Sequence, residues 1–401
     1  MSWPMVKLGS VGEFKAGFGF PVEYQGKKEG DYPFAKVGDI SAVVRSGHKN
    51  IFHAGNYIDK DILGNLKAKT IPKGTIVFAK IGEAIKQNFR AVTTVEMVID
   101  NNVMGLVPDN NLVDTNYLFY FMRSLDLYQF SGATTIPALR KSMLENIQIP
   151  LPPLSEQKRI AAILDKADSI RQKREQAIKL ADDFLRSTFL AMFGDPVGNP
   201  KEWKKDKIKK GVLDIASGWS ATGENTPCKS DEFGVLKISS VTSGIFKPEE
   251  NKIVHYESIP ASKKLIHPKK GDLLFSRANT RELVAAICMV HQNYDNLFLP
   301  DKLWTIKLNH ELLLPEFFLI LIQNEKVREL LTKQATGTSG SMLNISKNKF
   351  EETEIIFPEI NVQKDFCNAF RKTINLKAKL IKSNELANES FNSLSQKVFL
   401  Q

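Results

Sequence analysis

The chain has 401 residues, 42% hydrophobic and 25% charged, a composition typical of a folded globular protein with two or three domains. No segment approaches the roughly 20 consecutive apolar residues that a membrane-spanning helix needs, and residues 1–5 lack the pattern of a secretory signal. The three cysteines lie far apart without a Cys-x-x-Cys pair, which argues against a disulfide framework or thiolate metal site and favours a cytoplasmic setting. The 55 Lys and Arg residues outnumber the 45 Asp and Glu residues, and this net charge of +10 is compatible with binding a polyanion.

Residues 1–152 are expected to form a mixed α/β domain. Short apolar runs with strand character, such as 75–79, are separated by Lys-Gly and other turn signals, and a helix is predicted near 116–127. The pattern does not determine the order of the strands. Prolines within 149–153 end the domain, because proline continues neither a helix nor the interior of a sheet.

A long helix is predicted at 153–194. Ser155 stands where an N-cap belongs, no Gly or Pro follows until Phe193, and Gly194 then stops the helix, which is about 58 Å long at 1.5 Å per residue. Apolar residues at coiled-coil spacing predict a seam that needs a partner helix. They are Ile160, Ile163, Ala167, Ile170, Ala177, Ala181 and Phe184.

The same order of elements returns in the second half of the chain. Pro152 and Gln157 match Pro358 and Gln363, each 206 residues later, and Phe193 matches Phe399 at the same offset. The repeat predicts a second mixed α/β domain at 195–358, with a strand in 271–276 and a helix near 315–331. A second long helix follows at 359–401, with Asn361 as its N-cap. Its seam consists of Phe366, Ala369, Leu376, Leu380, Ala387 and Leu394.

The predicted fold is therefore of the α/β (α+β) class, a pseudo-two-fold repeat of two similar mixed domains and two long helices. The helices are expected to pair as an antiparallel coiled coil, since each presents a seam and small residues in the seams allow close approach. The alternative is that each helix packs separately on its own domain.

Motifs for catalysis are absent from the sequence. There is no P-loop, no Asn/Asp-Pro-Pro-aromatic signature of adenine methyltransferases, no common nuclease constellation and no Gly-x-Ser-x-Gly, and the six histidines form no metal-ligand pair at helix spacing. We therefore predict no catalytic residue, no bound metal and no cofactor.

Cations at matched positions point to DNA binding. Lys80 and Arg277 each follow a predicted strand directly, and Lys36 and Lys237 each follow a short apolar run. A cation that recurs in both halves is harder to explain as an ordinary surface charge than an isolated one, and Lys and Arg supply contacts to phosphates and base edges. Further candidates are Arg45, Lys86, Asn88, Arg90 and Thr134 in the first half, and Arg281, Lys302 and Ser339 in the second.

Two segments carry a family resemblance. Residues 150–168, Pro-Leu-Pro-Pro-Leu-Ser-Glu-Gln-Lys-Arg-Ile-Ala-Ala-Ile-Leu-Asp-Lys-Ala-Asp, open the first helix, and 184–196, Phe-Leu-Arg-Ser-Thr-Phe-Leu-Ala-Met-Phe-Gly-Asp-Pro, end it. With the repeat, they resemble the specificity subunit of type I restriction–modification enzymes over essentially the whole chain. The second copy departs from the pattern, because Val-Gln-Lys-Asp-Phe at 362–366 replaces the Glu-Gln-Lys-Arg-Ile core.

The resemblance implies two target-recognition domains, each reading one half of a bipartite, asymmetric site in double-stranded DNA, and a helical rod that sets the gap between the half-sites. It also implies two modification subunits that methylate adenine with S-adenosylmethionine, restriction subunits that can join them, and no catalysis in this chain. Two other readings remain: the recognition part of a type II-like restriction–modification system, and a repeat scaffold that binds proteins but no DNA. A steep fall of affinity with salt would argue against the scaffold.

Overall fold

The computed structural model describes residues 3–132, 136–337 and 342–399. The chain divides into two compact units, which we call unit 1 (residues 1–177 and 380–401) and unit 2 (residues 178–379). Each unit contains one mixed α/β domain and part of both long helices, α5 (Leu154–Phe193) and α10 (Ile360–Phe399). The α/β class and the duplicated domain-and-helix plan are thereby confirmed.

The domain of unit 1 contains a five-stranded sheet in the order β2-β9-β6-β7-β4 and a three-stranded sheet in the order β5-β3-β8, and a two-stranded ladder joins β1 to β10. Its strands are β1 (Met5–Lys7), β2 (Gly12–Ala16), β3 (Tyr32–Ala35), β4 (Asn50–Ile51), β5 (Asn56–Ile58), β6 (Ile76–Ala79), β7 (Arg90–Thr93), β8 (Val98–Ile99), β9 (Val103–Pro108) and β10 (Gln148–Pro150). Its α-helices are α1 (Val37–Arg45), α2 (Lys60–Asn65), α3 (Thr115–Ser124) and α4 (Lys141–Glu145).

The domain of unit 2 repeats this topology. A four-stranded sheet has the order β12-β19-β15-β17, a three-stranded sheet has the order β14-β13-β18, and two ladders join β11 to β21 and β16 to β20. Its strands are β11 (Lys205–Lys207), β12 (Val212–Ser217), β13 (Phe233–Leu236), β14 (Asn251–Val254), β15 (Leu273–Ser276), β16 (Ala278–Asn279), β17 (Ile287–Met289), β18 (Leu297–Phe298), β19 (Leu303–Leu308), β20 (Leu343–Asn344) and β21 (Glu354–Ile356). Its α-helices are α6 (Ser239–Thr242), α7 (Pro315–Gln323), α8 (Glu325–Lys333) and α9 (Lys347–Glu351).

The helix predicted at 315–331 is in fact two helices, α7 and α8. They are separated at Asn324, whose backbone is extended and whose side-chain oxygen accepts hydrogen bonds from the backbone N–H groups of Lys326 and Val327. An asparagine that caps a new helix in this way competes with continuation of the old one. In unit 1 the single helix α3 is capped by Asp114 instead.

The aromatic face of the domain helix forms the main core of each unit together with the long helices. In unit 1, Tyr117 and Phe121 of α3 contact Phe399 of α10, with ring centroids 5.3 and 5.5 Å apart. In unit 2, Phe317 of α7 contacts Phe193 of α5 at 4.8 Å. The matched phenylalanines of the repeat thus close equivalent cores, because each domain packs against the end of one long helix and the start of the other.

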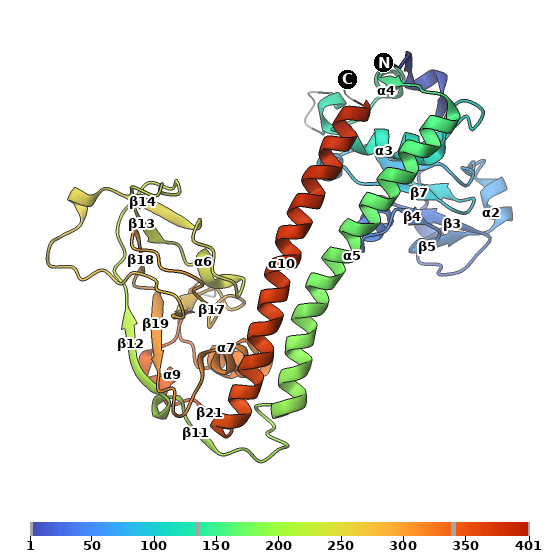
Figure 1. Cartoon of the computed structure of the whole chain (residues 1–401). Coiled ribbons are helices and arrows are strands. Elements are labelled where there is room, and N and C mark those ends of the chain that lie inside the picture. The colour runs from blue at the N-terminus through green and yellow to red at the C-terminus, as the bar shows by residue number, and fades with distance from the viewer. Residues whose placement is uncertain (1–2, 133–135, 338–341, 400–401) are drawn as a thin grey trace. The chain divides into compact units, whose positions relative to one another are not determined.

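The two long helices pack together within each unit, side by side and antiparallel (Figure 1). In unit 2, Asp182 of α5 pairs with Lys377 of α10 at 2.6 Å, and the Phe189 ring lies 5.6 Å from the Phe366 ring, so the numbering rises along one helix as it falls along the other. In unit 1, Arg174 of α5 donates to the Ser383 carbonyl at 2.8 Å. The predicted pairing of the helices is therefore confirmed.

The predicted seam and N-caps need correction. Ile163, Ile170 and Phe184 are 42%, 40% and 55% exposed, and Leu376 and Leu394 of α10 are also exposed. The predicted seam residues Ile160, Ala181 and Phe366 are buried, as expected. The rest of the buried line of α5 runs through positions outside the predicted seam: Gln157, Leu164, Asp168, Leu185 and Phe189. A strict heptad count misses this line because each helix also packs on a domain and follows the 3.6-residue period, which drifts from a seven-residue repeat. Ser155 and Asn361 lie inside the first turn, since the helices begin one residue earlier.

Two buried glutamines attach the long helices to the domains. The Gln157 side chain accepts from the Asp114 backbone N–H at 2.8 Å and donates to the carbonyls of Leu112 and Pro152. Gln363 makes the same three bonds in unit 2, to Leu314, Leu312 and Pro358. This shared role explains why the glutamine recurs at the same place in both halves of the sequence.

Candidate nucleic-acid interface

Lys80 and Arg277 occupy the same place in the two domains. Lys80 follows β6, its backbone N–H donates to the Asn102 carbonyl at 2.7 Å, and its own carbonyl accepts from Leu139. Arg277 follows β15, its N–H donates to the Lys302 carbonyl at 3.1 Å, and its carbonyl accepts from Ile345. Lys80 therefore lies between the turn before β9 and the segment that follows a glycine-containing loop. Arg277 lies at the equivalent place, between the turn before β19 and the segment after the corresponding loop.

We call these two places strand-end sites. Strand-end site 1 comprises Lys80 and the exposed Asn101 and Asn102, and strand-end site 2 comprises Arg277, Asp301, Lys302 and Asn344. The adjacent loops contain the candidates Thr134 and Ser339, which lie outside the described residues. The structure brings Arg277 and Lys302 together as backbone hydrogen-bond partners.

Strand-end site 2 holds its arginine in place. Arg277 donates from Nε to the Asp301 carbonyl at 2.9 Å and from Nη1 to Asn344 Oδ1 at 2.8 Å. The Asp301 carboxylate accepts from the Ser220 hydroxyl, and the Ser217 hydroxyl donates to the Asp301 carbonyl at 3.0 Å. The site therefore offers a fixed guanidinium beside several polar groups of the kinds that contact base edges and phosphates.

The second matched pair, Lys36 and Lys237, follows the central strands of the three-stranded sheets, β3 and β13. Both lysines are half-buried. Lys36 Nζ donates to Gln25 Oε1 at 2.8 Å and lies 5.5 Å from the Phe20 ring centroid, whereas the backbone N–H of Lys237 donates to the Glu250 carbonyl. Their places in the domains match, and their described contacts differ.

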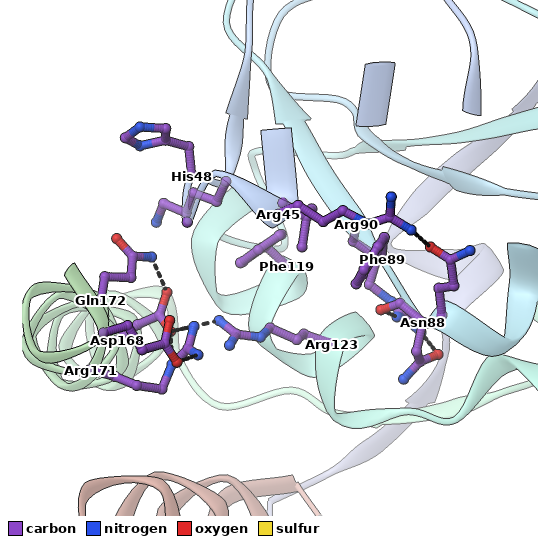
Figure 2. Close-up of a pocket in the computed structure, with 15 residues that line it drawn as sticks. Arg45, His48, Asn88, Phe89, Arg90, Phe119, Arg123, Asp168, Arg171 and Gln172 are labelled. Atoms are coloured by element: carbon purple, nitrogen blue, oxygen red, sulfur yellow. Dashed lines mark hydrogen bonds and ion pairs between the residues drawn. The ribbon is translucent and has the colours of Figure 1, made fainter. Parts of the chain in front are cut away.

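Three candidates of the first half line a separate cavity of about 420 Å³ between the domain of unit 1 and α5 (Figure 2). They are Arg45, Asn88 and Arg90. Arg45 donates to Gln87 Oε1 at 3.0 Å and remains exposed. Arg90 is only 3% exposed, and its guanidinium donates to Asn88 Oδ1 and to the Leu125 carbonyl at 2.8 and 2.9 Å.

The burial of Arg90 argues against the predicted DNA contact, because its side chain supports the loops around 88 and 125. Burial, followed by the neighbouring charge of Arg123, lowers the pKa of Arg90. Asn88 also serves this internal support, since its amide donates to the Leu125 carbonyl at 2.8 Å.

Asp168 of α5 is the centre of the polar network at this cavity (Figure 2). Its side chain is 4% exposed and binds Arg123 of α3 at 3.0 Å, Arg171 at 2.9 Å and Gln172 at 2.8 Å. A second cavity of about 590 Å³ shares Asp168 and Gln172. A buried carboxylate with two arginines is well compensated, so the network ties the domain to the helix.

The remaining candidates are surface cations. Lys86 pairs with Glu83 at 2.7 Å and lies 4.9 Å from the Tyr128 ring centroid, and Arg281 is exposed in the turn after β16. Within the described residues, no cluster of three or more His, Cys, Asp or Glu side chains could hold a metal ion. None of the helices in the same part of the chain is long and apolar enough to cross a membrane.

The duplicated architecture matches a known family. The model of the type I restriction modification DNA specificity domain matches residues 2–180 and again residues 200–388. The chain belongs to this family. The resemblance carried by residues 150–168 and 184–196 is thereby confirmed, and with it the expected class, a specificity subunit rather than a catalytic subunit.

This chain is distantly similar to curated specificity subunits. The EcoKI specificity subunit of Escherichia coli K12 is 25% identical over 73% of this chain and 66% of its own length. The MjaVIII specificity subunit of Methanocaldococcus jannaschii is 29% identical over 62% of this chain and 59% of its own length. The matches span less than two thirds of these relatives.

Solved structures share the fold. The S subunit of the type I restriction-modification system from M. genitalium aligns over 100% of this specificity protein and 96% of its own chain, with a TM-score of 0.59 and 14% identity. A chain from a study of complex assembly and conformational transition of the type I system aligns over 99% and 97%, with a TM-score of 0.54 and 17% identity.

Sequence reasoning missed the residues that connect the specificity domain of unit 1 to α5. Lys49 pairs with Asp165, and Arg123 pairs with Asp168, yet each pair joins segments far apart in the chain. No local pattern marks these residues, because Asp165 and Asp168 stand outside the predicted seam of Ile163, Ala167 and Ile170. Asp301 and Asn344 were also missed, because a carbonyl and an amide that orient an arginine leave no pattern in sequence.

Proposed function

We propose that this chain is the DNA-recognition subunit of a type I restriction–modification complex in the cytoplasm. Each domain reads one half of a bipartite, asymmetric site in double-stranded DNA, and the chain directs adenine methylation by two modification subunits and cleavage by restriction subunits. The observation that carries the proposal is the recurrence of one strand-end architecture with different side chains, Lys80 in one domain and Arg277 in the other. Two domains with the same backbone arrangement but different side chains for DNA contact suit the recognition of an asymmetric site.

Exposed apolar residues on the long helices support the proposed binding of partner subunits. Ile163 and Ile170 of α5 and Leu386 of α10 belong to unit 1, and Leu180 and Phe184 of α5 belong to unit 2; all are at least 40% exposed. Helices that already pack together do not need these side chains for their own pairing, and exposed apolar residues along one element are typical of protein-docking surfaces. We propose that they bind the modification subunits.

Methylome sequencing tests the function directly. Adenine methylation is mapped by long-read sequencing in cells that express the modification subunit, with this gene intact and with it deleted. We expect one split, asymmetric motif to lose methylation on deletion. A methylome that does not change while the modification subunit is expressed would refute the proposal and favour a protein scaffold.

Helix length provides a second test, because both long helices contribute residues to both units. Four residues inserted after Arg174 in α5, with four inserted opposite at Ser383 of α10, lengthen the pair by about 6 Å. We expect the gap between the half-sites to change while the bases read stay the same. Altered half-site bases at an unaltered gap would contradict a spacing role for the helices.

A further inference from the structure

The guanidinium of Arg277 is fixed by two acceptors from separate segments of unit 2. Nε is held by the Asp301 carbonyl in the turn before β19, and Nη1 is held by Asn344 on β20. An arginine has five N–H donors in a planar fork, so these two bonds leave three of them for a ligand. Arg277 is half-buried, which leaves part of the side chain accessible.

Both acceptors are neutral, so the positive charge of Arg277 is oriented without being neutralised. Arg171 shows the other arrangement, since it binds the carboxylates of Asp168 and Glu175 at 2.9 and 2.8 Å. Arg90 is also held by neutral acceptors, but it is only 3% exposed, whereas part of Arg277 is accessible. A side chain that only contacts phosphate needs charge but little orientation, whereas bidentate reading of a base needs a planar fork in a defined direction. Holding the fork before DNA arrives also lowers the entropy lost on binding.

Strand-end site 1 lacks this arrangement. Lys80 replaces the arginine, and Asn101 and Asn102 stand where site 2 has Asp301 and Lys302. A lysine donates from a single nitrogen on a flexible stem and cannot reproduce a bidentate fork. The two sites therefore present cations of different shape at equivalent backbone positions: an oriented planar fork in site 2 and a single ammonium group in site 1.

We propose that Arg277 is a specificity-determining residue that reads a guanine in the half-site of unit 2. Its free donors bind guanine O6 and N7 in the major groove, the pair of acceptors that matches an arginine fork. Asp301 and Asn344 are positioning residues that aim the fork. This inference rests on the proposed function, since it assigns one base within the site that the proposed function requires.

The test compares methylation motifs and DNA affinity for the full chain with its modification subunits. Arg277→Lys keeps the charge and removes the fork, and Asn344→Ala removes one orienting bond. The matched control is Lys264→Ala, an exposed cation of the same domain that is not among the DNA-binding candidates. The half-site that the Arg277 and Asn344 variants leave unaffected shows that the complex is assembled and folded.

For Arg277→Lys we expect one position of one half-site to lose its preference for guanine, with affinity for the original site falling roughly ten- to hundred-fold. Asn344→Ala should relax the same position to a smaller extent, and Lys264→Ala should leave the motif unchanged. An unchanged motif in both Arg277→Lys and Asn344→Ala, or a relaxed position that is not guanine, would overturn the inference. If the unaltered chain and its partners direct no sequence-specific methylation, the proposed function fails first, and that outcome is distinguishable from failure of the Arg277 assignment.

Discussion

In each unit an ion pair joins the domain to a long helix, but the helix supplies the acidic residue in unit 1 and the basic residue in unit 2. In unit 1, Asp165 of α5 pairs with Lys49 of the domain, which also donates to Asn116 at 3.1 Å. In unit 2, the matched helix position, 206 residues later, is Arg371, and it pairs with Glu316 of the domain at 2.6 Å. The helix positions match and the signs of the charges are exchanged, but the domain partner lies just before β4 in unit 1 and on α7 in unit 2.

One helical turn further along, the joints differ in polarity. Unit 1 has Asp168 in its arginine network, flanked by cavities of about 420 and 590 Å³. Unit 2 has Ile374 at the matched position, packed against its aromatic core. At this helix position the joint of unit 1 therefore depends on ionic contacts and that of unit 2 on apolar packing, so the two should respond differently to mutation.

The largest expected effect is a difference in stability loss when the aromatic core of each unit is disrupted. Phe193 contacts four rings in unit 2, those of Phe189, Trp203, Phe317 and Phe366, whereas Phe399 contacts two in unit 1. We expect Phe193→Ala to lower the free energy of unfolding of unit 2 by about 3–5 kcal/mol, and Phe399→Ala to lower that of unit 1 by less. Hydrogen exchange resolved by unit measures both, and equal losses would weaken the comparison.

The ionic joint of unit 1 is tested by Asp168→Asn. The change leaves Arg123 and Arg171 without their shared carboxylate, and we expect it to cost about 2–3 kcal/mol, below the figure for a fully buried pair because both arginines are partly exposed. Asp182→Asn is the control, since Asp182 is about half exposed and pairs with one lysine. A similar cost for both variants would show that burial of Asp168 is not what matters.

The charge-reversed pair of unit 2 should respond asymmetrically. Glu316 is buried, whereas the Arg371 side chain is 59% exposed. Arg371→Ala strands a buried carboxylate and is expected to cost about 1–2 kcal/mol, whereas adding Glu316→Gln removes the stranded charge and should recover most of the loss. Thermal unfolding of the single and double variants measures this, and no recovery in the double variant would contradict the explanation.

The smallest expected effect is a change in the salt dependence of DNA affinity, which distinguishes the two strand-end sites. If Lys80 contacts a phosphate, Lys80→Ala should weaken binding to every sequence alike and reduce the slope of log affinity against log salt by about 1. Arg277→Ala should instead act mainly on the preferred sequence. Titrations of cognate and unrelated duplexes at several salt concentrations measure both slopes, and a selective loss for Lys80→Ala would move that lysine among the base-reading groups.

Local signals in the sequence predicted the elements of this fold well. Proline runs and glycines bound the long helices, the apolar run 75–79 forms β6, and the paired motifs at Gln157 and Gln363 mark a real structural repeat. These predictions succeed because turn, cap and helix signals act over a few residues. The exposure of Ile163 and the burial of Arg90 were not predicted, because burial depends on partners that lie far away in the chain.

The sequence by itself determined the duplicated plan, the two long helices, the family and the matched cations that follow β6 and β15. Only the tertiary structure decided the strand order, the face that each long helix buries, and the side chains that orient Arg277 or surround Asp168. The physical reason is range: helix and turn preferences arise within a few residues, whereas burial and electrostatic pairing arise between segments that folding brings together. Arg123 and Asp168 are 45 residues apart in the chain and 3.0 Å apart in the folded unit.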